Sequence, residues 1–319
     1  MPQNPMKTDL RLLGKVSKLY YERQFTQQEI AERLNLSRPK VSRLLKQARR
    51  EGIVQISVLH PSGTFNELEN QLEETFNLNE AVIVESEVST PQEVILKEIG
   101  SAAAGYLHRT LKDGDHIGVS WGTTLNAMVN ALPARDACDV HVVQIIGGLG
   151  PPEAEVHATD LCRRLSRQLN SKLTLIPAPG IVDSQKSKDV LLSETHVQRA
   201  FDLFPKINTA YVGIGAPTPT SVVMRNSDIL SQEELRVLLD QGCVGDIALR
   251  FFDMRGTPIT SELDTRVIGI SLEQLRQINR VVGIAGGPDK VKAVYGALVG
   301  GMINVLITDL VTAKHILTL

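Results

Sequence analysis

Residues 25–52 read FTQQEIAERLNLSRPKVSRLLKQARREG, a stretch with the pattern of two short helices joined by a tight turn. Thr26 followed three residues later by Glu29 forms a capping box, in which each side chain satisfies an open amide of the first turn. Ser37 is a favoured N-cap residue, and Pro39 is tolerated in the first turn of the helix that it starts. The stretch therefore predicts a helix-turn-helix.

The second of these helices has an apolar face and a basic face. Val41, Leu44, Leu45 and Ala48 repeat at i, i+3, i+4 and i+7, the spacing of a buried helical face. A recognition helix reads base edges mainly from its N-terminal half, and arginine suits guanine. The expected base contacts are Arg38, Lys40 and Arg43. The expected phosphate contacts are Gln27, Ser37, Ser42 and Lys46.

The sequence on either side extends this module. Residues 12–20 have the spacing of a preceding helix, and Ile53 to Val58 alternates like a short strand, which favours a winged-type helix-turn-helix. His60-Pro61-Ser62-Gly63 is a cluster of helix and strand breakers. We therefore predict a DNA-binding domain over residues 1–60 and a second domain over residues 61–319.

Charge is divided unevenly between these two parts. Residues 1–60 hold 12 lysines and arginines against 5 acidic residues, a net charge of +7. The remaining residues hold 22 basic and 31 acidic residues, a net charge of −9. A basic module on an acidic body indicates a polyanion partner, here double-stranded operator DNA, for the module alone. The alternative is a structural helical hairpin with a solvated basic surface.

Composition limits the other classes. A chain of 319 residues with 42% hydrophobic and 22% charged residues can bury a large core and suits two domains. The longest apolar stretch, residues 297–308, is broken by Gly300, Gly301 and Asn304, which argues against a membrane span. The first residues lack the apolar core of a signal peptide, so we expect a cytoplasmic protein. Three separated cysteines predict neither disulfides nor a metal site.

The second domain alternates short β-rich runs with helical segments, which predicts an α/β fold with a mostly parallel, Rossmann-like sheet. The expected strands are residues 81–84, 116–120, 140–146, 173–177, 210–214, 246–252, 281–285 and 303–308. The expected helices include residues 94–111, 161–169 and 272–278.

Glycines gather just after several of these strands, in GVSWGTT, IIGGLG, GIGAP and AGGPDK. In open α/β sheets a ligand binds at the carboxyl ends of strands, where glycine lets backbone amides approach it. Residues 120–124, SWGTT, add hydroxyls and a helix start that favours an anion. We interpret this loop as the best single candidate for holding a phosphate or sugar hydroxyls. The alternative is that the glycines only make tight turns.

Other chemistries are less well supported. GIGAPTPTS lacks the third glycine of a dinucleotide fingerprint, and its prolines would disrupt the receiving helix, so no nucleotide cofactor is expected. No histidine pair has metal-ligand spacing on a helix. A catalytic base would have to be a carboxylate, and four aspartates are available. These are Asp113, Asp115, Asp246 and Asp309. Asp113-Gly114-Asp115 is better read as a turn before a strand, and Asp309 could equally cap a helix that begins at Val311. His157 is the one histidine considered for ligand contact.

The chain also resembles the SorC family of bacterial transcriptional regulators over nearly its whole length. In the first module the matching pieces include Thr26-Gln27, Leu36-Ser37-Arg38 and Val41-Ser42-Arg43-Leu44-Leu45. In the body they include GDHIGVSWGTTL, VQIIGG, GCVGDIALRFFDMRGTPI and VVGIAGGPDKVKAVYGALVGG. The order of the pieces is more specific than any one of them.

The resemblance implies an effector domain similar to sugar-phosphate isomerases and glucosamine-phosphate deaminases. It implies that a sugar or sugar phosphate binds there and changes the affinity for operator DNA, and that the protein self-associates to a dimer or tetramer. The implied phosphate end is Ser120, Trp121, Gly122, Thr123 and Thr124. The next loop would supply Gln144, Gly147 and Gly148, and the walls would be Asp246, Phe252 and Lys290. Many members have a basic residue at Thr123, so a free sugar stays open.

The sequence thus predicts a regulator of carbohydrate metabolism that binds DNA and a sugar effector and is not an enzyme. The alternative is a sugar-phosphate isomerase-like or deaminase-like enzyme with an appended nucleic-acid module. Turnover separates the two, because a regulator leaves its sugar chemically unchanged.

Overall fold

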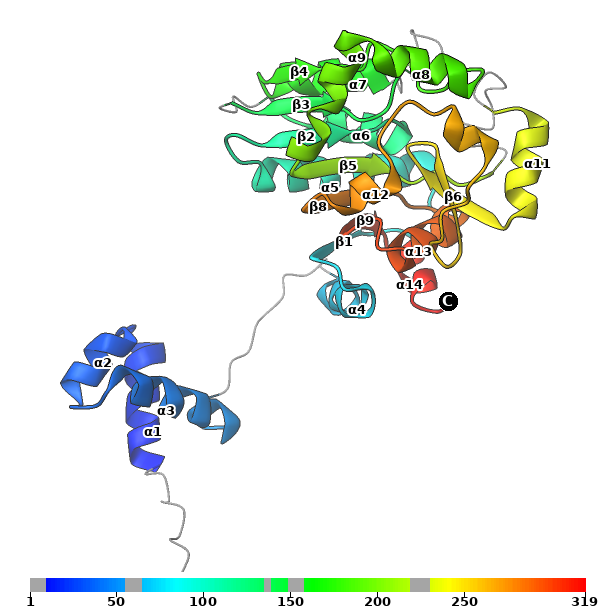
Figure 1. Cartoon of the computed structure of the whole chain (residues 1–319). Helices are drawn as coiled ribbons and strands as arrows, with labels where there is room; N and C mark the ends of the chain where they lie inside the picture. Colours follow the sequence, from blue (N-terminus) through cyan, green and yellow to red (C-terminus); the bar gives the residue numbers. More distant parts are fainter. Residues whose placement is uncertain (1–9, 55–64, 135–138, 149–157, 219–229) are drawn as a thin grey trace, which may run out of the picture. The chain divides into compact units, whose positions relative to one another are not determined.

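Two units make up the chain, Met1–Ser62 and Gly63–Leu319, and each is described by itself (Figure 1). The computed structural model describes residues 10–54, 65–134, 139–148, 158–218 and 230–319. The smaller unit is helical. Its elements are α1 (Leu10–Ser17), a π-helical turn (Lys18–Glu22), α2 (Gln27–Arg33) and α3 (Arg38–Arg50).

The helices of the smaller unit enclose one small apolar core. All three helices and the π-helical turn contribute to it, because each places an apolar stripe inward. The buried residues are Leu13, Val16, Leu19, Ile30, Ala31, Val41, Leu44, Leu45 and Ala48. The predicted helix-turn-helix is therefore present, and α2 and α3 are its two helices. Ile53 and Val54 form a bend after α3, and residues 55–58 of the expected strand lie outside the described part.

The larger unit is built on a seven-stranded parallel sheet of order β1-β9-β8-β5-β2-β3-β4. Its strands are rich in buried apolar residues, as expected where helices cover a parallel sheet on both faces. The predicted Rossmann-like fold is confirmed. The strands are β1 (Glu80–Val84), β2 (His116–Val119), β3 (His141–Gln144), β4 (Lys172–Thr174), β5 (Thr209–Gly213), β8 (Arg280–Ile284) and β9 (Val305–Asp309).

Three helices pack side by side on this sheet: α5 (Gln92–Thr110), α6 (Thr123–Ala131) and α7 (Ala158–Gln168). Two others, α13 (Val291–Val299) and α14 (Leu310–Ile316), pack against each other. The remaining helices are α4 (Asn66–Phe76), α8 (Gln185–Ser193), α9 (Thr195–Phe201), α11 (Gln232–Asp240) and α12 (Leu272–Arg276). Short 3-10 turns are Phe204–Lys206, Glu262–Thr265 and Pro288–Lys290. No helix in these described ranges is long and apolar enough to cross a membrane.

Residues 246–252, expected as one strand, instead form most of a hairpin. β6 (Cys243–Ile247) and β7 (Arg250–Asp253) pair antiparallel. Ala248 and Leu249 make the turn, both with positive φ, and the Asp246 carboxylate accepts a hydrogen bond from the Leu249 amide at 3.2 Å. The single-strand prediction was wrong because neither turn residue is a glycine or asparagine, the usual sign of such a turn.

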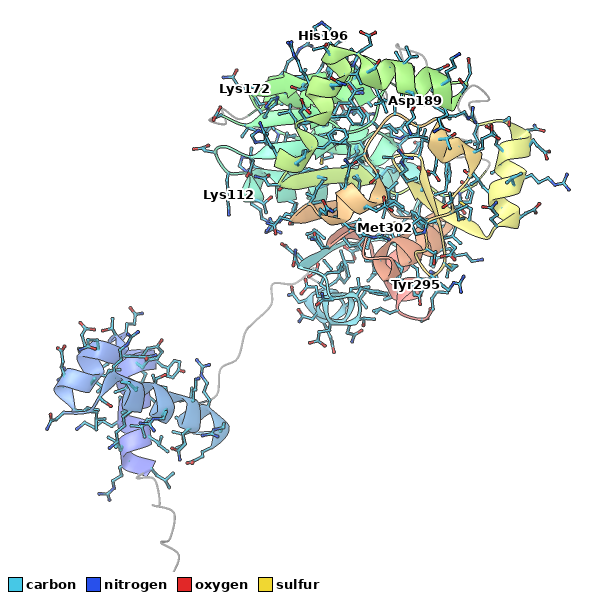
Figure 2. The ribbon with its side chains drawn as sticks, in the orientation of Figure 1. Lys112, Lys172, Asp189, His196, Tyr295 and Met302 are labelled. Atoms are coloured by element: carbon cyan, nitrogen blue, oxygen red, sulfur yellow. The ribbon has the colours of Figure 1, made fainter. Side chains whose placement is uncertain are left out.

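Helix α4 closes one edge of the sheet. The edge strand β1 would leave outward amides unpaired, but Glu73 accepts a hydrogen bond from Ala81 N at 2.8 Å, and Glu69 accepts one from Ile83 N at 2.9 Å. Phe76 of α4 also meets the ring of Tyr295, which is labelled in Figure 2, with centroids 5.9 Å apart. Two carboxylates one helical turn apart therefore take the place of a neighbouring strand.

Candidate functional site

The outer face of α3 carries most of the residues predicted to contact DNA, since Val41, Leu44, Leu45 and Ala48 turn inward. Five of the seven predicted residues are exposed and two are half-buried. The exposed ones are Ser37, Arg38, Lys40, Arg43 and Lys46, and the half-buried ones are Gln27 and Ser42. The structure thus leaves these residues accessible, six of them at α3 and Gln27 at the start of α2.

The two helix starts on this surface differ in their capping. Thr26 accepts a hydrogen bond from the Glu29 amide, and Glu29 accepts one from the Thr26 amide at 2.7 Å, so the predicted capping box is confirmed. Hydrogen bonds from the Thr26 backbone and side chain lower the pKa of Glu29. Ser37 occupies the N-cap position of α3 but makes no side-chain capping bond. Its exposed hydroxyl is therefore available to donate to a phosphate oxygen.

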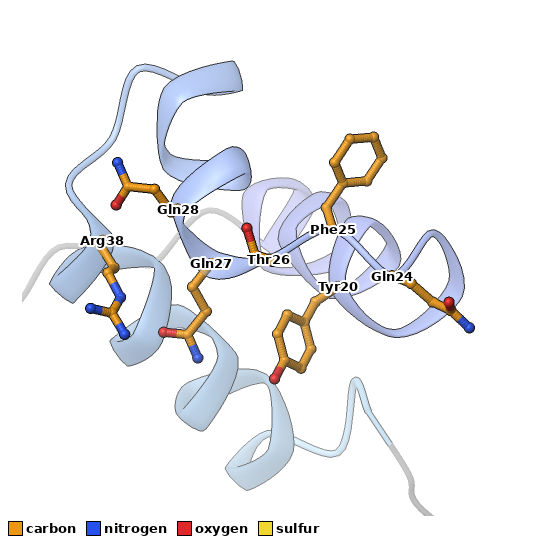
Figure 3. A pocket seen from close by; sticks show the side chains of 7 residues that line it. All are labelled: Tyr20, Gln24, Phe25, Thr26, Gln27, Gln28 and Arg38. Atoms are coloured by element: carbon orange, nitrogen blue, oxygen red, sulfur yellow. The ribbon is translucent and has the colours of Figure 1, made fainter.

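A hollow of about 730 Å³ lies where α2 and α3 begin. Figure 3 shows Gln27 and Arg38 reaching into it from neighbouring helices. Its lining also includes Tyr20, Gln24, Phe25, Thr26 and Gln28. Sequence reasoning assigned Arg38 to bases and did not select Tyr20, Phe25 or Gln28. Phe25 and Gln28 lie on either side of the Thr26 N-cap of α2, so their signal was closeness to a predicted helix start, and Tyr20 lies in the preceding π-helical turn.

In the larger unit the strand order marks the place where open α/β sheets form their ligand crevice. The chain passes from β2 outward to β3 and β4, then returns to place β5 on the other side of β2. Such a reversal separates the loops that follow two adjacent strands, and ligands bind there in open α/β sheets. The loops at this point follow β2, at residues 120–122, and β5, at residues 214–217.

The loop after β2 is hydrogen-bonded to the last residues of β5 and β8. Ser120 Oγ accepts a hydrogen bond from Gly213 N at 3.3 Å, and Thr124 Oγ1 donates one to Ile284 O at 3.0 Å. Gly122 has φ +123°, a conformation that favours glycine, and a Cβ there would meet no atom within 4 Å. Gly122 caps α6 without a side-chain bond, and Thr123 is exposed. The first amides of α6 are thus open to a hydroxyl or an anion.

The β6–β7 hairpin brings a buried carboxyl to the same crevice. Gly215, just after β5, pairs with Asp246 through the bonds Gly215 N to Asp246 O, 2.8 Å, and Asp246 N to Gly215 O, 3.2 Å. A side chain at Gly215 would overlap the Asp246 carboxyl, so that carboxyl lies directly against the end of β5. Burial raises the pKa of Asp246, and the charge of Lys290 partly offsets this.

Lys290 supplies a positive charge near the Asp246 carboxyl. It ends the 3-10 turn Pro288–Lys290 that follows β8. Burial lowers the pKa of Lys290, while Asp246 and Asp289 oppose that shift. The strands β2, β5 and β8 and the hairpin therefore assemble an acidic side chain, a basic side chain, a hydroxyl loop and open amides, a combination able to bind a polyol or an anion.

Four predicted residues have structural partners instead. Gln144 is fully buried and donates to Ile146 O at 2.6 Å, and Phe252 is fully buried in the core. Gly147 leaves no room for a side chain beneath Pro179, and Gly148 N donates to Ala178 O at 3.0 Å. The core and the loop packing occupy these groups, and Trp121, 8% exposed, belongs to the same core, so their contacts with an effector stay predictions.

The other aspartates considered as bases have local roles. Asp113 and Gly114 form the turn before β2, and Asp115 accepts bonds from Lys112 N and Asn208 Nδ2. Asp309 is the N-cap of α14, as one reading of the sequence predicted. His157 lies outside the described residues. No group of three metal-ligating side chains occurs within the described ranges.

Comparison with known proteins agrees with this architecture. A sugar-binding domain family matches residues 60–318, and a Crp-like helix-turn-helix family matches residues 10–61. The deoxyribonucleoside regulator of Bacillus subtilis is 35% identical over 93% of this chain and 94% of its own. The sorbitol operon regulator of Klebsiella pneumoniae is 33% identical over 97% and 98%.

Solved structures agree as well. The full-length sorbitol operon regulator SorC from Klebsiella pneumoniae matches with a TM-score of 0.75 at 32% identity, over 98% of this chain and 99% of that chain. A helix-turn-helix unit and a sugar-binding domain occur here in the same order and over the same length. The chain therefore belongs to the SorC family of transcriptional regulators.

Proposed function

We propose that the protein regulates genes of carbohydrate metabolism and that a sugar or sugar phosphate bound in the β2/β5 crevice sets its operator affinity. The observation that carries the effector site is the position of the buried Asp246 carboxyl at the end of β5, within range of the Lys290 charge, because β5 is the neighbour of β2, whose loop leads into α6. Sugar hydroxyls donate to a carboxylate and accept from an ammonium group, so this pair suits a polyol. Open amides at a helix start add a place for a phosphate.

The names of the relatives indicate which compounds to try. They refer to a deoxyribonucleoside, to sorbitol and to erythritol catabolism. The screen therefore contains sorbitol, erythritol and deoxyribose, together with the phosphate ester of each. Pairing every sugar with its ester also decides whether the effector is phosphorylated.

Thermal unfolding of the full chain tests the site. A ligand that binds only the native state at 100 times its Kd adds about 2.7 kcal/mol, or roughly 5–10 °C for a unit of this size. We expect one compound to produce such a shift in the wild type and none in Lys290→Met. A shift of equal size in both proteins would show that the effector binds elsewhere.

An enzymatic role is the second candidate. A carboxyl of raised pKa beside a lysine of lowered pKa could move protons during an isomerisation. We propose instead that the pair only binds, because the relatives are transcriptional regulators. NMR of the screened sugars after incubation with the protein tests this, since any new sugar signal would support the enzyme.

Arg43→Ala is expected to weaken operator binding without unfolding the smaller unit. Arg43 is exposed opposite the buried stripe of α3, and loss of a base contact costs about 1–3 kcal/mol and relaxes preference at one position. The measurement is a mobility shift on operator DNA selected from a random pool. Arg50→Ala, at the other end of α3, is the control and should weaken all sequences alike. Unchanged operator affinity of the Arg43 variant would contradict the assignment.

We also expect the protein to bind DNA as a dimer or a larger even oligomer. One helix-turn-helix covers a short site, and two-fold pairs read half-sites about 10 base pairs apart or multiples of that. Light scattering at concentrations where operator is bound measures the state. A monomer under those conditions would be incompatible with this prediction.

A further inference from the structure

Asp309 is a buried carboxylate that the proposed effector site does not use. It is fully buried at the end of β9, with no exposed surface. Burial acts to raise its pKa, but hydrogen bonds from Thr312, Gly287 and Ser86 outweigh burial and leave the pKa lowered. A charge kept away from water needs such compensation to be tolerated.

Four donors supply that compensation. Ser86 Oγ and Thr312 N donate to Oδ1 at 2.9 and 3.0 Å. Gly287 N and Thr312 Oγ1 donate to Oδ2 at 2.7 and 2.6 Å. A carboxylate accepts about four hydrogen bonds, so Asp309 is saturated by neutral groups. Capping α14 requires only the Thr312 amide, and the bonds to Ser86 and Gly287 join two other segments.

The first of these segments carries Lys290. Gly287 N is bound to Asp309, and Gly287 O accepts a hydrogen bond from Lys290 N at 2.9 Å. On the other side of the loop, Gln92 Nε2 donates to Gly286 O at 3.1 Å. A side chain at Gly286 would overlap Asp309. The glycines of this loop therefore allow the loop to touch Asp309, and two successive hydrogen bonds link the carboxylate to the backbone of Lys290.

The second segment leads to α4. Ser86 lies two residues beyond β1, and its Oγ also accepts a bond from Val311 N at 3.3 Å. β1 is bound to α4 by the Glu69 and Glu73 carboxylates, and α14 packs on α4, on β1 and on the 3-10 turn that contains Lys290. In the chain, α4 is the first described element after the smaller unit.

We infer that Asp309 is a positioning residue that couples the loop of Lys290 to β1 and α4. Binding in the crevice would thereby change the local stability of α4, the described helix nearest in sequence to the DNA-binding unit. The inference rests on the proposed function for the identity of the crevice. Coupling between two sites requires an element whose arrangement each site can shift. The four hydrogen bonds of Asp309 form a direct link between the Lys290 loop and the β1–α4 segment.

The test perturbs the loop of Gly286, Gly287 and Lys290 and measures hydrogen exchange of α4 in the full chain, without sugar or DNA. Gly287→Ala strains a residue with φ +99° and displaces Gln92. We expect hydrogen exchange at Ala81, Ile83 and residues 66–76 to become about tenfold faster, a change of local opening that mass spectrometry resolves. Gly242→Ala is the matched control: its φ is +80°, and its added Cβ meets nothing within 4 Å. It should leave exchange in α4 at the wild-type rate.

Variants of Ser86 test whether the coupling from this loop to α4 passes through the hydrogen bond between Ser86 and Asp309. In a Ser86→Ala background, Gly287→Ala should add little to exchange at α4, whereas Ser86→Thr, which keeps the hydroxyl, should restore the effect. Wild-type exchange at α4 in Gly287→Ala, or the same tenfold rise with and without the Ser86 hydroxyl, would overturn the coupling.

A milder variant covers the case in which Gly287→Ala unfolds the larger unit, recognised by fast exchange in β3 and β4 as well. Gln92→Ala removes the bond to Gly286 O without backbone strain. It should speed exchange at α4 in the wild type and not in Ser86→Ala. Because neither effector nor operator is present, failure here leaves the thermal-shift result standing, and the reverse also holds.

Discussion

Gly122→Val is expected to abolish the effect of the sugar on operator affinity while operator binding itself keeps wild-type strength. Gly122 has φ +123°, which a β-branched residue adopts only with strain, and its backbone leads into the open amides of α6. A ligand shifts an equilibrium only through different affinity for two states, so loss of the pocket removes the response. Operator titrations with and without the compound that gives the largest thermal shift measure it.

Two further variants make this result specific. Thr123→Glu places a carboxylate at the exposed start of α6, where it repels a phosphate. Gly242→Val is the control, since Gly242 shares the positive φ and the free space around its Cβ but lies at the end of α11. All melting temperatures are measured in parallel. A wild-type response in both Gly122→Val and Thr123→Glu would remove this loop from the effector site.

Ile30→Ala is expected to unfold the smaller unit and abolish DNA binding without changing the melting of the larger one. Ile30 has no exposed surface and belongs to a small core in which nine of the described residues are buried. Large-to-small changes at such sites cost about 2–5 kcal/mol, comparable with the whole stability of a unit this small.

The control for this variant lies on the same helix. Glu32 is exposed, and within the described part of the chain its side chain accepts a hydrogen bond from Gln28 Nε2 at 2.9 Å, so Glu32→Ala should change stability by about 0.5 kcal/mol or less. Circular dichroism and calorimetry of the full chain follow the two units separately. Wild-type operator affinity in Ile30→Ala would show that packing outside this core holds the unit together.

Local signals in the sequence predicted local structure well. The Thr26–Glu29 capping box, the buried face of α3, the alternation of the parallel sheet and the helix cap at Asp309 are all present. Each depends on residues within one or two turns of each other. The Crp-like and sugar-binding matches confirm the two kinds of unit that these patterns indicated.

Contacts between distant segments were harder to predict. The glycine pairs after β3 and β8 suggested ligand approach, yet Gly147 is required by Pro179 and Gly286 by Asp309 and Ile99. Sequence spacing alone does not show which distant segment packs so closely against a glycine that a side chain would not fit. The same limit hid the two bonds that link Asp309 to Ser86 and Gly287, which are separated from it by 223 and 22 residues.

The two edges of the sheet both disfavour strand pairing between copies of this protein. Glu69 and Glu73 occupy the amides of β1 at one edge, and the other edge strand, β4, has three residues and begins with the exposed Lys172, labelled in Figure 2. Backbone templating, the route to fibres, is therefore disfavoured at both ends. Any association between copies is therefore expected to use side-chain surfaces. Replacing both Glu69 and Glu73 with leucine should leave the β1 amides unpaired and cause time-dependent precipitation, which light scattering measures.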